Sequence, residues 1–176
     1  VSLVGMGAGC GDYDGDGHVD LFISCVGPDH LFHNTGERFV DVSQAAGVAG
    51  DSAAWSSACG WFDYDRDGDL DLYVANYVKF SFDRPVSRTT GGRSVYPGPR
   101  DFEPDPDTLS RNNGDGTFSD VSDVSGIASH AGPSMGIVCT DYDRDGDPDV
   151  FVGNDSFANF LFRNNGDGTF SEVGLL

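Results

Sequence analysis

The stretch DYDGDGHVDLFI at residues 12–23 recurs twice, as DYDRDGDLDLYV at 63–74 and as DYDRDGDPDVFV at 141–152. Each copy places aspartates in the pattern D-x-D-x-D-G-x-x-D and then runs directly into an apolar segment. A pattern that returns at intervals along one chain predicts a fold built from repeated structural units. The size of the repeated unit therefore decides the architecture.

Two further elements accompany every copy. Small residues precede it, as in GMGAGCG at 5–11, and a segment such as LFRNNGDGTF from Leu161 follows it. The unit reads as small-residue strand, Asp loop, apolar strand, connection, strand, tight turn and strand. Four strands in roughly 45 residues are the size of one β-propeller blade. We therefore expect an all-β chain of about three four-stranded antiparallel blades, a partial propeller: blade 1 at 1–50, blade 2 at 51–129 and blade 3 at 130–176.

The residue types of the expected strands agree with this interpretation. Continuous apolar runs such as Leu72-Tyr73-Val74 are typical of strands buried on both faces. Small residues such as Gly7 and Ala58 suit an innermost strand, where neighbouring blades crowd together. The Asn-Gly and Asp-Gly pairs at 113–116 and 165–168 predict tight hairpins, because both residue types tolerate positive φ.

Blade 2 is longer than the others because of an insertion at about 77–108. This segment holds five of the eight prolines and five of the ten basic residues, so we expect a long loop and not a fourth blade. Arginines, prolines and aromatic residues favour an ordered contact loop. We expect it to make the main specific contact of the chain, with a protein or an acidic glycan, or else to cap the neighbouring blade. Its aromatic residues are Tyr77, Phe80, Phe82, Tyr96 and Phe102.

Composition excludes several classes of function. The 29 acidic residues outnumber the 10 lysines and arginines, and a formal charge of -19 argues against binding nucleic acid or an anionic membrane surface. No apolar run has the roughly 20 residues of a membrane span. Of the acids 26 are Asp and only 3 are Glu, which favours turns and metal loops over helices. The 21 aromatic residues argue against disorder.

The Asp loops are candidate calcium sites. Acids at alternate positions of a tight turn point toward one centre, the sixth-position glycine permits the sharp bend, and the seventh residue offers its backbone carbonyl. Oxygen ligands without thiolate or imidazole select Ca²⁺ over zinc or copper, so we expect up to three calcium ions. The candidate ligands are Asp12, Asp14, Asp16, His18, Asp20, Asp63, Asp65, Asp67, Asp69, Asp71, Asp141, Asp143, Asp145, Asp147 and Asp149, with His18, Asp69 and Asp147 acting through the carbonyl.

The alternative interpretation of these loops is a set of acidic surface turns. Three copies at the same place in the unit weaken it, and carboxylates held a few ångströms apart without a cation would repel one another. The loops are not EF-hands. The twelfth position, where an EF-hand has a bidentate Glu, is Ile23, Val74 or Val152, and strands flank each loop.

Together, the triplicate Asp loops, the GMGAG-type strand and the LFRNNGDGTF element resemble calcium-binding propeller repeats of the FG-GAP/VCBS type. In particular they resemble the ASPIC/UnbV, cartilage acidic protein-like family, and integrin α-subunits carry similar calcium loops. The resemblance implies a seven-bladed propeller with Ca²⁺ between the first two strands of a blade. It also implies an extracytoplasmic location (secreted, periplasmic or cell-surface) and a non-enzymatic role in binding or scaffolding. This chain departs from that family in having only three blades.

Other functions stay open at this point. We expect no catalytic residue and no enzyme activity, with a protein partner or the remaining blades of a larger chain or assembly as the binding partner. A lectin-like glycan binder using Tyr96 and Phe102, or a propeller hydrolase or lyase with an axial active site, are the alternatives. The four histidines lack metal-ligand spacing and are expected to be structural or solvent-facing. The four cysteines allow three disulfide pairings, and their apolar or small-residue contexts favour free thiols.

Overall fold

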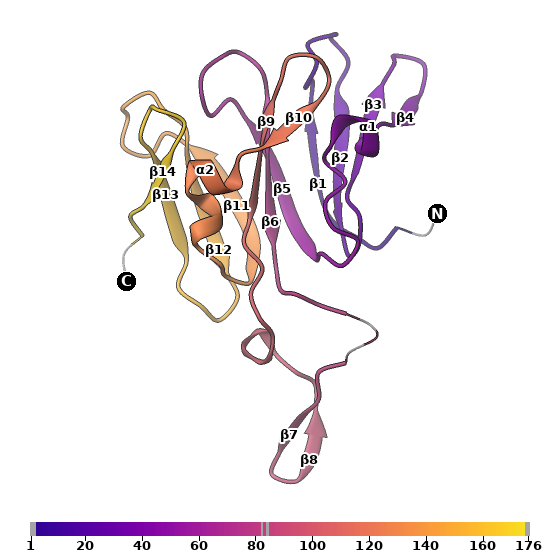
Figure 1. Ribbon diagram of the computed structural model, residues 1–176, viewed down its shortest axis with the longest axis vertical. Coiled ribbons are helices and arrows are strands. Elements are labelled where there is room, and N and C mark those ends of the chain that lie inside the picture. Colours follow the sequence, from indigo (N-terminus) through magenta and orange to yellow (C-terminus); the bar gives the residue numbers. More distant parts are fainter. Residues whose placement is uncertain (1–2, 82, 84, 175–176) are drawn as a thin grey trace.

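The structure is a computed structural model that describes residues 3–81, 83 and 85–174. Its main feature is three four-stranded antiparallel sheets standing side by side (Figure 1). The first contains β1 (Gly5–Gly11), β2 (Asp20–Cys25), β3 (His30–Asn34) and β4 (Phe39–Asp41). The second contains β5 (Ser56–Phe62), β6 (Asp71–Asn76), β9 (Thr108–Asn112) and β10 (Phe118–Asp120). The third contains β11 (Ser134–Thr140), β12 (Asp149–Asn154), β13 (Phe160–Asn164) and β14 (Phe170–Glu172).

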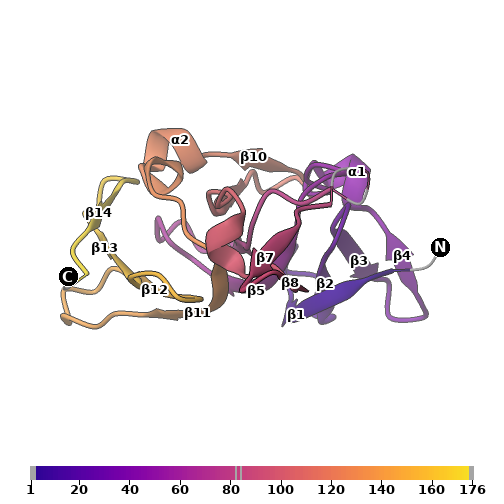
Figure 2. The same cartoon turned by 90° about the horizontal axis from the view of Figure 1, so that it is seen from below.

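In each sheet the strands pair in the order in which the chain makes them. The first strand of every sheet lies at the inner side, and the later strands fan outward, as the view from below shows (Figure 2). The predicted fold class is confirmed: the described chain consists of propeller-like antiparallel blades that form an arc rather than a closed ring. We use blades 1, 2 and 3 below for the three sheets in chain order.

Small residues let the inner strands approach one another. Strand β5 lies between β1 and β11 (Figure 2). A Cβ atom added at Gly60 would lie 2.8 Å from Cδ1 of Ile137 on β11, and one added at Gly7 would lie 2.9 Å from the carbonyl oxygen of Ser57 on β5. Both distances are shorter than a normal contact, so the sequence of small residues sets how closely neighbouring blades pack.

The hydrophobic core lies between the blades. One cluster joins blades 1 and 2, and a second joins blades 2 and 3. The first comprises Tyr13, Phe22, Leu31, Ala46, Val48, Leu72, Val74 and Phe118. The second comprises Phe62, Tyr64, Tyr73, Leu109, Ile127, Val150, Val152, Phe162 and Phe170. At the first interface the Trp61 ring stacks on Tyr13, with ring centroids 6.0 Å apart and planes 12° from parallel.

The helices are short and follow the outermost strands. Helix α1 (Ser43–Ala46) comes after β4 and α2 (Ser122–Ser125) after β10, and the 3-10 turn η2 (Ile127–Ser129) follows α2. Glycines with positive φ, Gly47 and Gly126, end the two helices. A single helical turn is too short to show 3.6-residue periodicity, so the residue pattern does not predict these helices.

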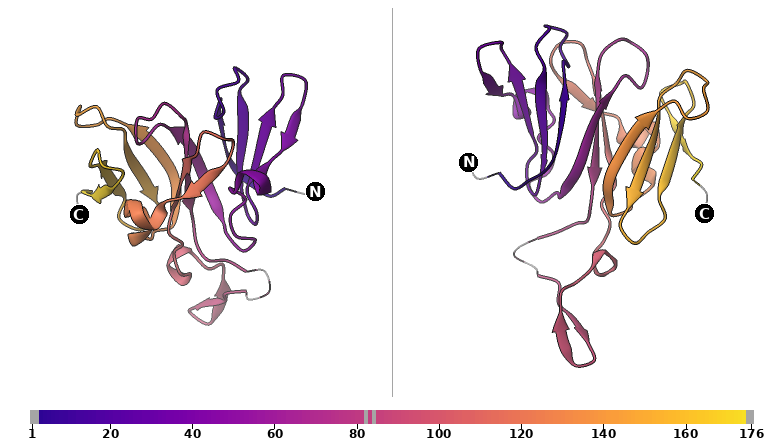
Figure 3. Two further views of the ribbon diagram at one scale, coloured as in Figure 1. Left: turned by 45° about the horizontal axis from the view of Figure 1, so that its top comes forward. Right: turned by 180° about the vertical axis from the view of Figure 1, so that it is seen from behind.

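The insertion between β6 and β9 contains secondary structure of its own, contrary to the expectation of a plain loop. Strands β7 (Arg88–Thr90) and β8 (Arg93–Val95) form a hairpin, and the 3-10 turn η1 (Pro99–Asp101) follows. The hairpin projects from the end of the molecule opposite the Asp loops (Figures 1 and 3). Gly91 and Gly92, with φ of +58° and +76°, form its turn, so a Gly-Gly signal was present in the sequence.

At the base of the insertion, aromatic side chains contact one another rather than solvent. Trp55 packs edge-on against Tyr77 and Phe80, with ring centroids 5.1 and 5.3 Å apart, and Phe80 also packs on Phe102 at 6.2 Å. Three of the five aromatic residues expected to contact a partner thus hold the insertion together. Phe82 lies outside the described residues, and Tyr96 is 98% exposed.

The four cysteines are free thiols. Cys25 is buried, and burial raises the pKa of Cys59 and Cys139 to about 12, so these thiols stay protonated at neutral pH. Among the described residues, no helix has the length and apolar character needed to cross a membrane.

Candidate metal centre

The three Asp loops connect the first two strands of each blade and lie at the same end of the molecule (Figure 1). Each loop is closed by backbone N–H groups that donate to its own carboxylates. In blade 2, Gly68 N donates to Asp63 Oδ2 at 3.1 Å and Asp69 N donates to Asp67 Oδ1 at 2.9 Å. The corresponding bonds recur in blades 1 and 3. The repeated sequence therefore folds into the same loop three times.

Positive φ angles make the tight bend. The sixth-position glycines Gly17, Gly68 and Gly146 have φ of +88°, +100° and +97°, a region that a Cβ disfavours. The fourth position also has positive φ, +60° at Arg66 and +66° at Arg144. Non-glycine residues in this conformation are uncommon, and here the loop hydrogen bonds hold them.

The ninth-position aspartates Asp20, Asp71 and Asp149 are buried. In blade 2, Asp71 accepts from Tyr64 N at 3.0 Å and from Asn112 N at 2.8 Å. Both other blades repeat this pair of bonds. Burial nevertheless raises the pKa of Asp71 to about 7, and it raises the pKa of Asp20 and Asp149 above the ordinary value as well. Burial opposes the ionised form, and a nearby cation would favour it.

The loops gather carboxylate oxygens within 4.8 Å of one another. The carboxylate groups are Asp12, Asp14 and Asp16 in blade 1; Asp63, Asp65 and Asp71 in blade 2; and Asp141, Asp143 and Asp149 in blade 3, while Asp14 and Asp20 also form a group with His33. The fifth-position residues Asp67 and Asp145 fall outside these groups. Asp12 Oδ1 and Asp63 Oδ1 are shielded from solvent without a hydrogen-bond partner. Clustered carboxylates with free buried oxygens fit a hard cation such as Ca²⁺.

The side chains of the seventh-position residues lie against the following turn of their own blade. Asp69 Oδ2 would lie 3.1 Å, and Asp147 Oδ2 2.9 Å, from a Cβ added at Gly114 and Gly166 respectively. Asp147 Oδ1 also pairs with Nε of Arg66 at 3.0 Å. The role of the seventh-position backbone carbonyl as a ligand stays a prediction.

One histidine expected to be structural or solvent-facing lies against the acids of loop 1. His33 Nδ1 lies 3.1 Å from Asp14 Oδ2 and 3.3 Å from Asp20 Oδ1. Blades 2 and 3 have Arg111 and Arg163 at this repeat position. The proximity was missed because His33 lies on β3, outside the loop sequence.

Asparagines at the end of the third strand link each loop to the preceding blade. Asn112 Nδ2 donates to the carbonyl of Tyr13 at 2.7 Å, and Asn164 Nδ2 donates to the carbonyl of Tyr64 at 2.7 Å. Each also donates to a carbonyl of its own loop. The sequence predicts hairpin turns at the adjacent residues 113–116 and 165–168, and it does not indicate these contacts between blades.

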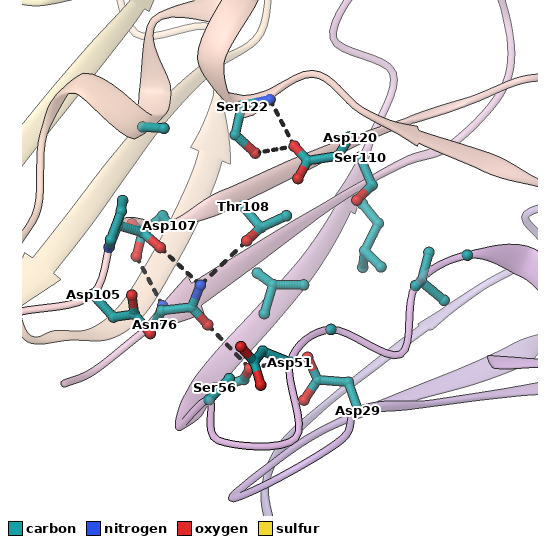
Figure 4. Close-up of a pocket in the computed structure, with 18 of the residues that line it drawn as sticks. Asp29, Asp51, Ser56, Asn76, Asp105, Asp107, Thr108, Ser110, Asp120 and Ser122 are labelled. Atoms are coloured by element: carbon teal, nitrogen blue, oxygen red, sulfur yellow. Dashed lines mark hydrogen bonds between the residues drawn. The ribbon is translucent and has the colours of Figure 1, made fainter. Parts of the chain in front are cut away.

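A second group of acids lines a cavity of about 460 Å³ formed by residues of blades 1 and 2 (Figure 4). Asp29 and Asp107, both 4% exposed, lie in its wall. Burial raises the pKa of Asp29 to about 6 and that of Asp107 to about 7. Raised carboxyl pKa values are typical of hydrolase acids, so the partners of these groups decide their role.

Both carboxylates are engaged in equivalent structural bonds. Asp107 Oδ1 accepts from Asn76 N at 2.8 Å, and Oδ2 accepts from the hydroxyl of Ser134 on the next blade at 3.1 Å. Asp29 likewise accepts from Cys25 N and from the Ser56 hydroxyl of the next blade. These repeated bonds connect successive blades and give both acids a structural role.

Comparison with known proteins agrees with the repeated loops and blades. The FG-GAP-like repeat matches residues 12–74, 102–152 and 141–175, which together are most of the chain. The chain belongs to the FG-GAP-like repeat family. The resemblance inferred from the loop and strand motifs is thereby confirmed.

Curated relatives of this FG-GAP-like chain are cartilage acidic proteins. Cartilage acidic protein 1 of Homo sapiens is 28% identical over 194 residues, covering 81% of this chain and 29% of the relative. The Xenopus tropicalis protein is 26% identical over 208 residues, covering 89% of this chain and 32% of the relative. The chain therefore spans less than a third of the length of these relatives.

Proposed function

We propose that this chain is a calcium-stabilised section of an extracytoplasmic β-propeller that acts as a structural or protein-interaction module and has no catalysis of its own. The observation that carries the proposal is the threefold recurrence of an all-carboxylate loop at one position in each blade. A calcium ion bound there would supply positive charge that offsets the mutual repulsion of the acids. The chain's own part is to hold those oxygens in place through the loop N–H groups.

The ligands proposed are those of the three loops, with the ninth-position acids as the most buried members. Asp71 illustrates the reasoning: its raised pKa marks a carboxylate whose ionised form lacks sufficient compensation from its hydrogen bonds. A cation would supply that compensation. The exposure of most of the other loop acids suits a site that exchanges ions with a calcium-rich medium.

An extracytoplasmic location is supported by the names of the relatives, which are cartilage acidic proteins. Extracellular calcium modules operate with Kd values on the order of 10⁻⁴–10⁻³ M, which exposed loops can reach. We assign the same kind of location to this chain.

The faces of the end blades support the proposal that further blades continue the arc. Phe22 and Tyr73 are fully buried by the following blade, whereas Phe151 at the same repeat position of blade 3 is 41% exposed. Tyr142 is likewise 44% exposed, against 5% for its blade 2 counterpart Tyr64. Each exposed residue occupies a position that the repeat buries elsewhere. The occupant that fits is another blade of the same type.

Thermal unfolding with calcium and with EGTA tests the calcium proposal. A site that binds only the folded chain adds about 2.7 kcal/mol to the free energy of unfolding at a hundredfold excess of ligand over Kd. We expect the melting temperature followed by circular dichroism to rise with calcium and to rise less with magnesium. An unchanged melting temperature in EGTA would show that the loops are acidic turns.

A further inference from the structure

The insertion in blade 2 is fixed at its base. Lys79 N donates to the carbonyl of Glu103 at 2.9 Å, and the two side chains form an ion pair. Tyr77 donates its hydroxyl to Asp155 Oδ2 at 2.8 Å, which ties the base to blade 3. Contacts at both ends of the insertion therefore hold the residues between them at a defined place relative to the blades.

The part beyond the base is exposed along its length. Every residue from 85 to 96, which includes β7 and β8, is exposed. Val86 and Val95 are 37% and 40% exposed, and Tyr96 is 98% exposed. Val95 and Tyr96 adjoin on the projecting hairpin and offer a partner an apolar surface.

Charge distinguishes this hairpin from the rest of the molecule. Residues 85–100 contain three arginines and no acid, in a chain whose formal charge is -19. Arg88 pairs with Asp101 at 3.2 Å, and Arg100 donates to the Ser156 carbonyl at 2.9 Å. Arg93 forms no ion pair among the residues that the structure describes. Its charge is therefore available to an anionic partner.

The strand register gives the hairpin one cationic face. Arg88 lies opposite Val95 and Thr90 lies opposite Arg93, so these four side chains share a face, while Thr89 opposite Ser94 forms the other. Strands β7 and β8 pair only with each other, so each also has a free backbone edge. A free edge can accept an extended peptide as a third strand.

We propose that the β7–β8 hairpin is the recognition element of this chain and binds an extended acidic segment of a partner protein. Carboxylates of such a segment match Arg93 and its neighbours, and its backbone matches the open strand edge. The exposed valines favour a peptide, because a sugar chain has no aliphatic side chains to pack there. Arg and Tyr are also the residues that dominate protein interfaces. The inference rests on the proposed role as an interaction module and specifies its partner.

The test is selection of peptides from a random phage-displayed library on the whole chain in calcium. We expect enrichment of sequences with acidic residues at alternating positions. The affinity of a selected synthetic peptide, measured by biolayer interferometry, should fall about tenfold or more in Arg93→Glu. Arg38→Glu is the matched control, because it makes the same charge change at an exposed arginine in the turn before β4 and should leave binding unchanged.

A second variant, Tyr96→Ala, removes the most exposed aromatic ring and should also weaken binding without affecting the fold. Selected peptides lacking acidic bias, or equal losses in Arg93→Glu and Arg38→Glu, would overturn the proposal. So would binding of heparin oligosaccharides through Arg93 with no peptide selected, which would identify a glycan site. The calcium-dependent melting temperature is measured on the same variants. If it fails to respond in the parent chain while peptide binding persists, the calcium proposal fails and this one stands.

Discussion

Single aspartates have different roles in this chain, and burial separates them. Asp71 is fully buried and accepts hydrogen bonds from two backbone N–H groups. Asp65, at the third position of the same loop, is exposed. The buried acid holds β6 to the end of β9 as well as facing the loop. Among the described residues, the exposed acid forms no bond to a strand, so its replacement tests the proposed ligand role without removing a strand contact.

The first prediction follows from that difference. Asp65→Ala should lower the calcium-dependent gain in unfolding free energy by about 3 kcal/mol, the contribution of one site at a hundredfold excess of calcium over Kd. The control is Asp123→Ala, an exposed acid in helix α2 outside the loops. Chemical denaturation with calcium and with EGTA measures both. Equal effects of the two variants would contradict the ligand assignment.

The second prediction concerns pH and the buried Asp107. Its folded pKa of about 7 lies above the unfolded value of 3.8, so the folded chain retains a proton that the unfolded chain releases. The stability that this group contributes is complete below pH 4 and is lost as pH rises toward 7. Relative to Asp107→Asn, the wild-type unfolding free energy should fall by about 1.4 kcal/mol per pH unit in that range.

Denaturation curves of both proteins from pH 5 to pH 8 at constant calcium check this slope. Above pH 7 the difference in unfolding free energy between the two proteins should stay constant, because Asp107 is then ionised in both the folded and the unfolded chain. A difference independent of pH from the start would mean that Asp107 is ionised throughout.

Residue-level prediction from the sequence succeeded where the chemistry is local. The acids of each loop lie within nine positions, so the pattern alone placed them between two strands. It missed His33, Asn112 and Asp107, whose partners lie on other strands or other blades. Those contacts depend on strand register and blade packing, which a single unit of the repeat does not contain. The role of the loop acids as calcium ligands stays a prediction.

At the scale of elements, the contact between the Asp loops of neighbouring blades differs from one blade interface to the other. Arg66 at the fourth position of loop 2 reaches Asp147 of loop 3, with Nε and Oδ1 3.0 Å apart. Loop 1 has Gly15 at that position and so has no side chain to reach loop 2. The contact between loops therefore differs at the two blade interfaces, although both have the asparagine bond.

The third prediction uses this difference. Arg66→Asn keeps a residue that tolerates positive φ but removes the ion pair, and Arg144→Asn makes the same change at the same loop position of blade 3. We expect Arg66→Asn to lower the unfolding free energy more, by about 0.5 kcal/mol, since the pair is partly exposed. High salt should remove the difference. A difference that survives in high salt would point to packing rather than charge.

Element-level prediction was correct for the blades and incomplete for the insertion. Alternation of small, apolar and turn residues repeats in each blade, and the strands follow it. The hairpin of the insertion occurs only once in the chain, so the repeat pattern did not predict it. Its Gly91-Gly92 turn lies between the two segments that pair as strands, 88–90 and 93–95. Composition indicated an ordered loop, and only the structure showed that its aromatic residues are used internally.

At the scale of the whole molecule, the open arc leaves an apolar face of blade 3 exposed. The exposed face of blade 3 carries Val138, Tyr142 and Phe151, which are 56%, 44% and 41% exposed. A cluster of this kind favours association in water. We expect sedimentation velocity to show concentration-dependent association of the chain on its own.

The fourth prediction compares one repeat position in two blades. Phe151→Asp should reduce this association and leave the melting temperature nearly unchanged, because the ring has no neighbouring blade. Tyr73→Asp, at the buried equivalent position of blade 2, should prevent folding because it places a charge in the core. A monomeric wild-type chain at all concentrations would contradict the idea that this face seeks another blade.

The two tryptophans lie in different regions of the molecule, so their fluorescence can report on each region separately. Trp61 stacks on Tyr13 at the contact of blades 1 and 2, while Trp55 packs against Tyr77 and Phe80 beneath the insertion. Intrinsic emission from Trp55→Phe should thus follow separation of the blades, and emission from Trp61→Phe should follow disturbance of the insertion base. Calcium should change the first signal more than the second, because the stacked Tyr13 belongs to an Asp loop. A binder at the hairpin should do the reverse.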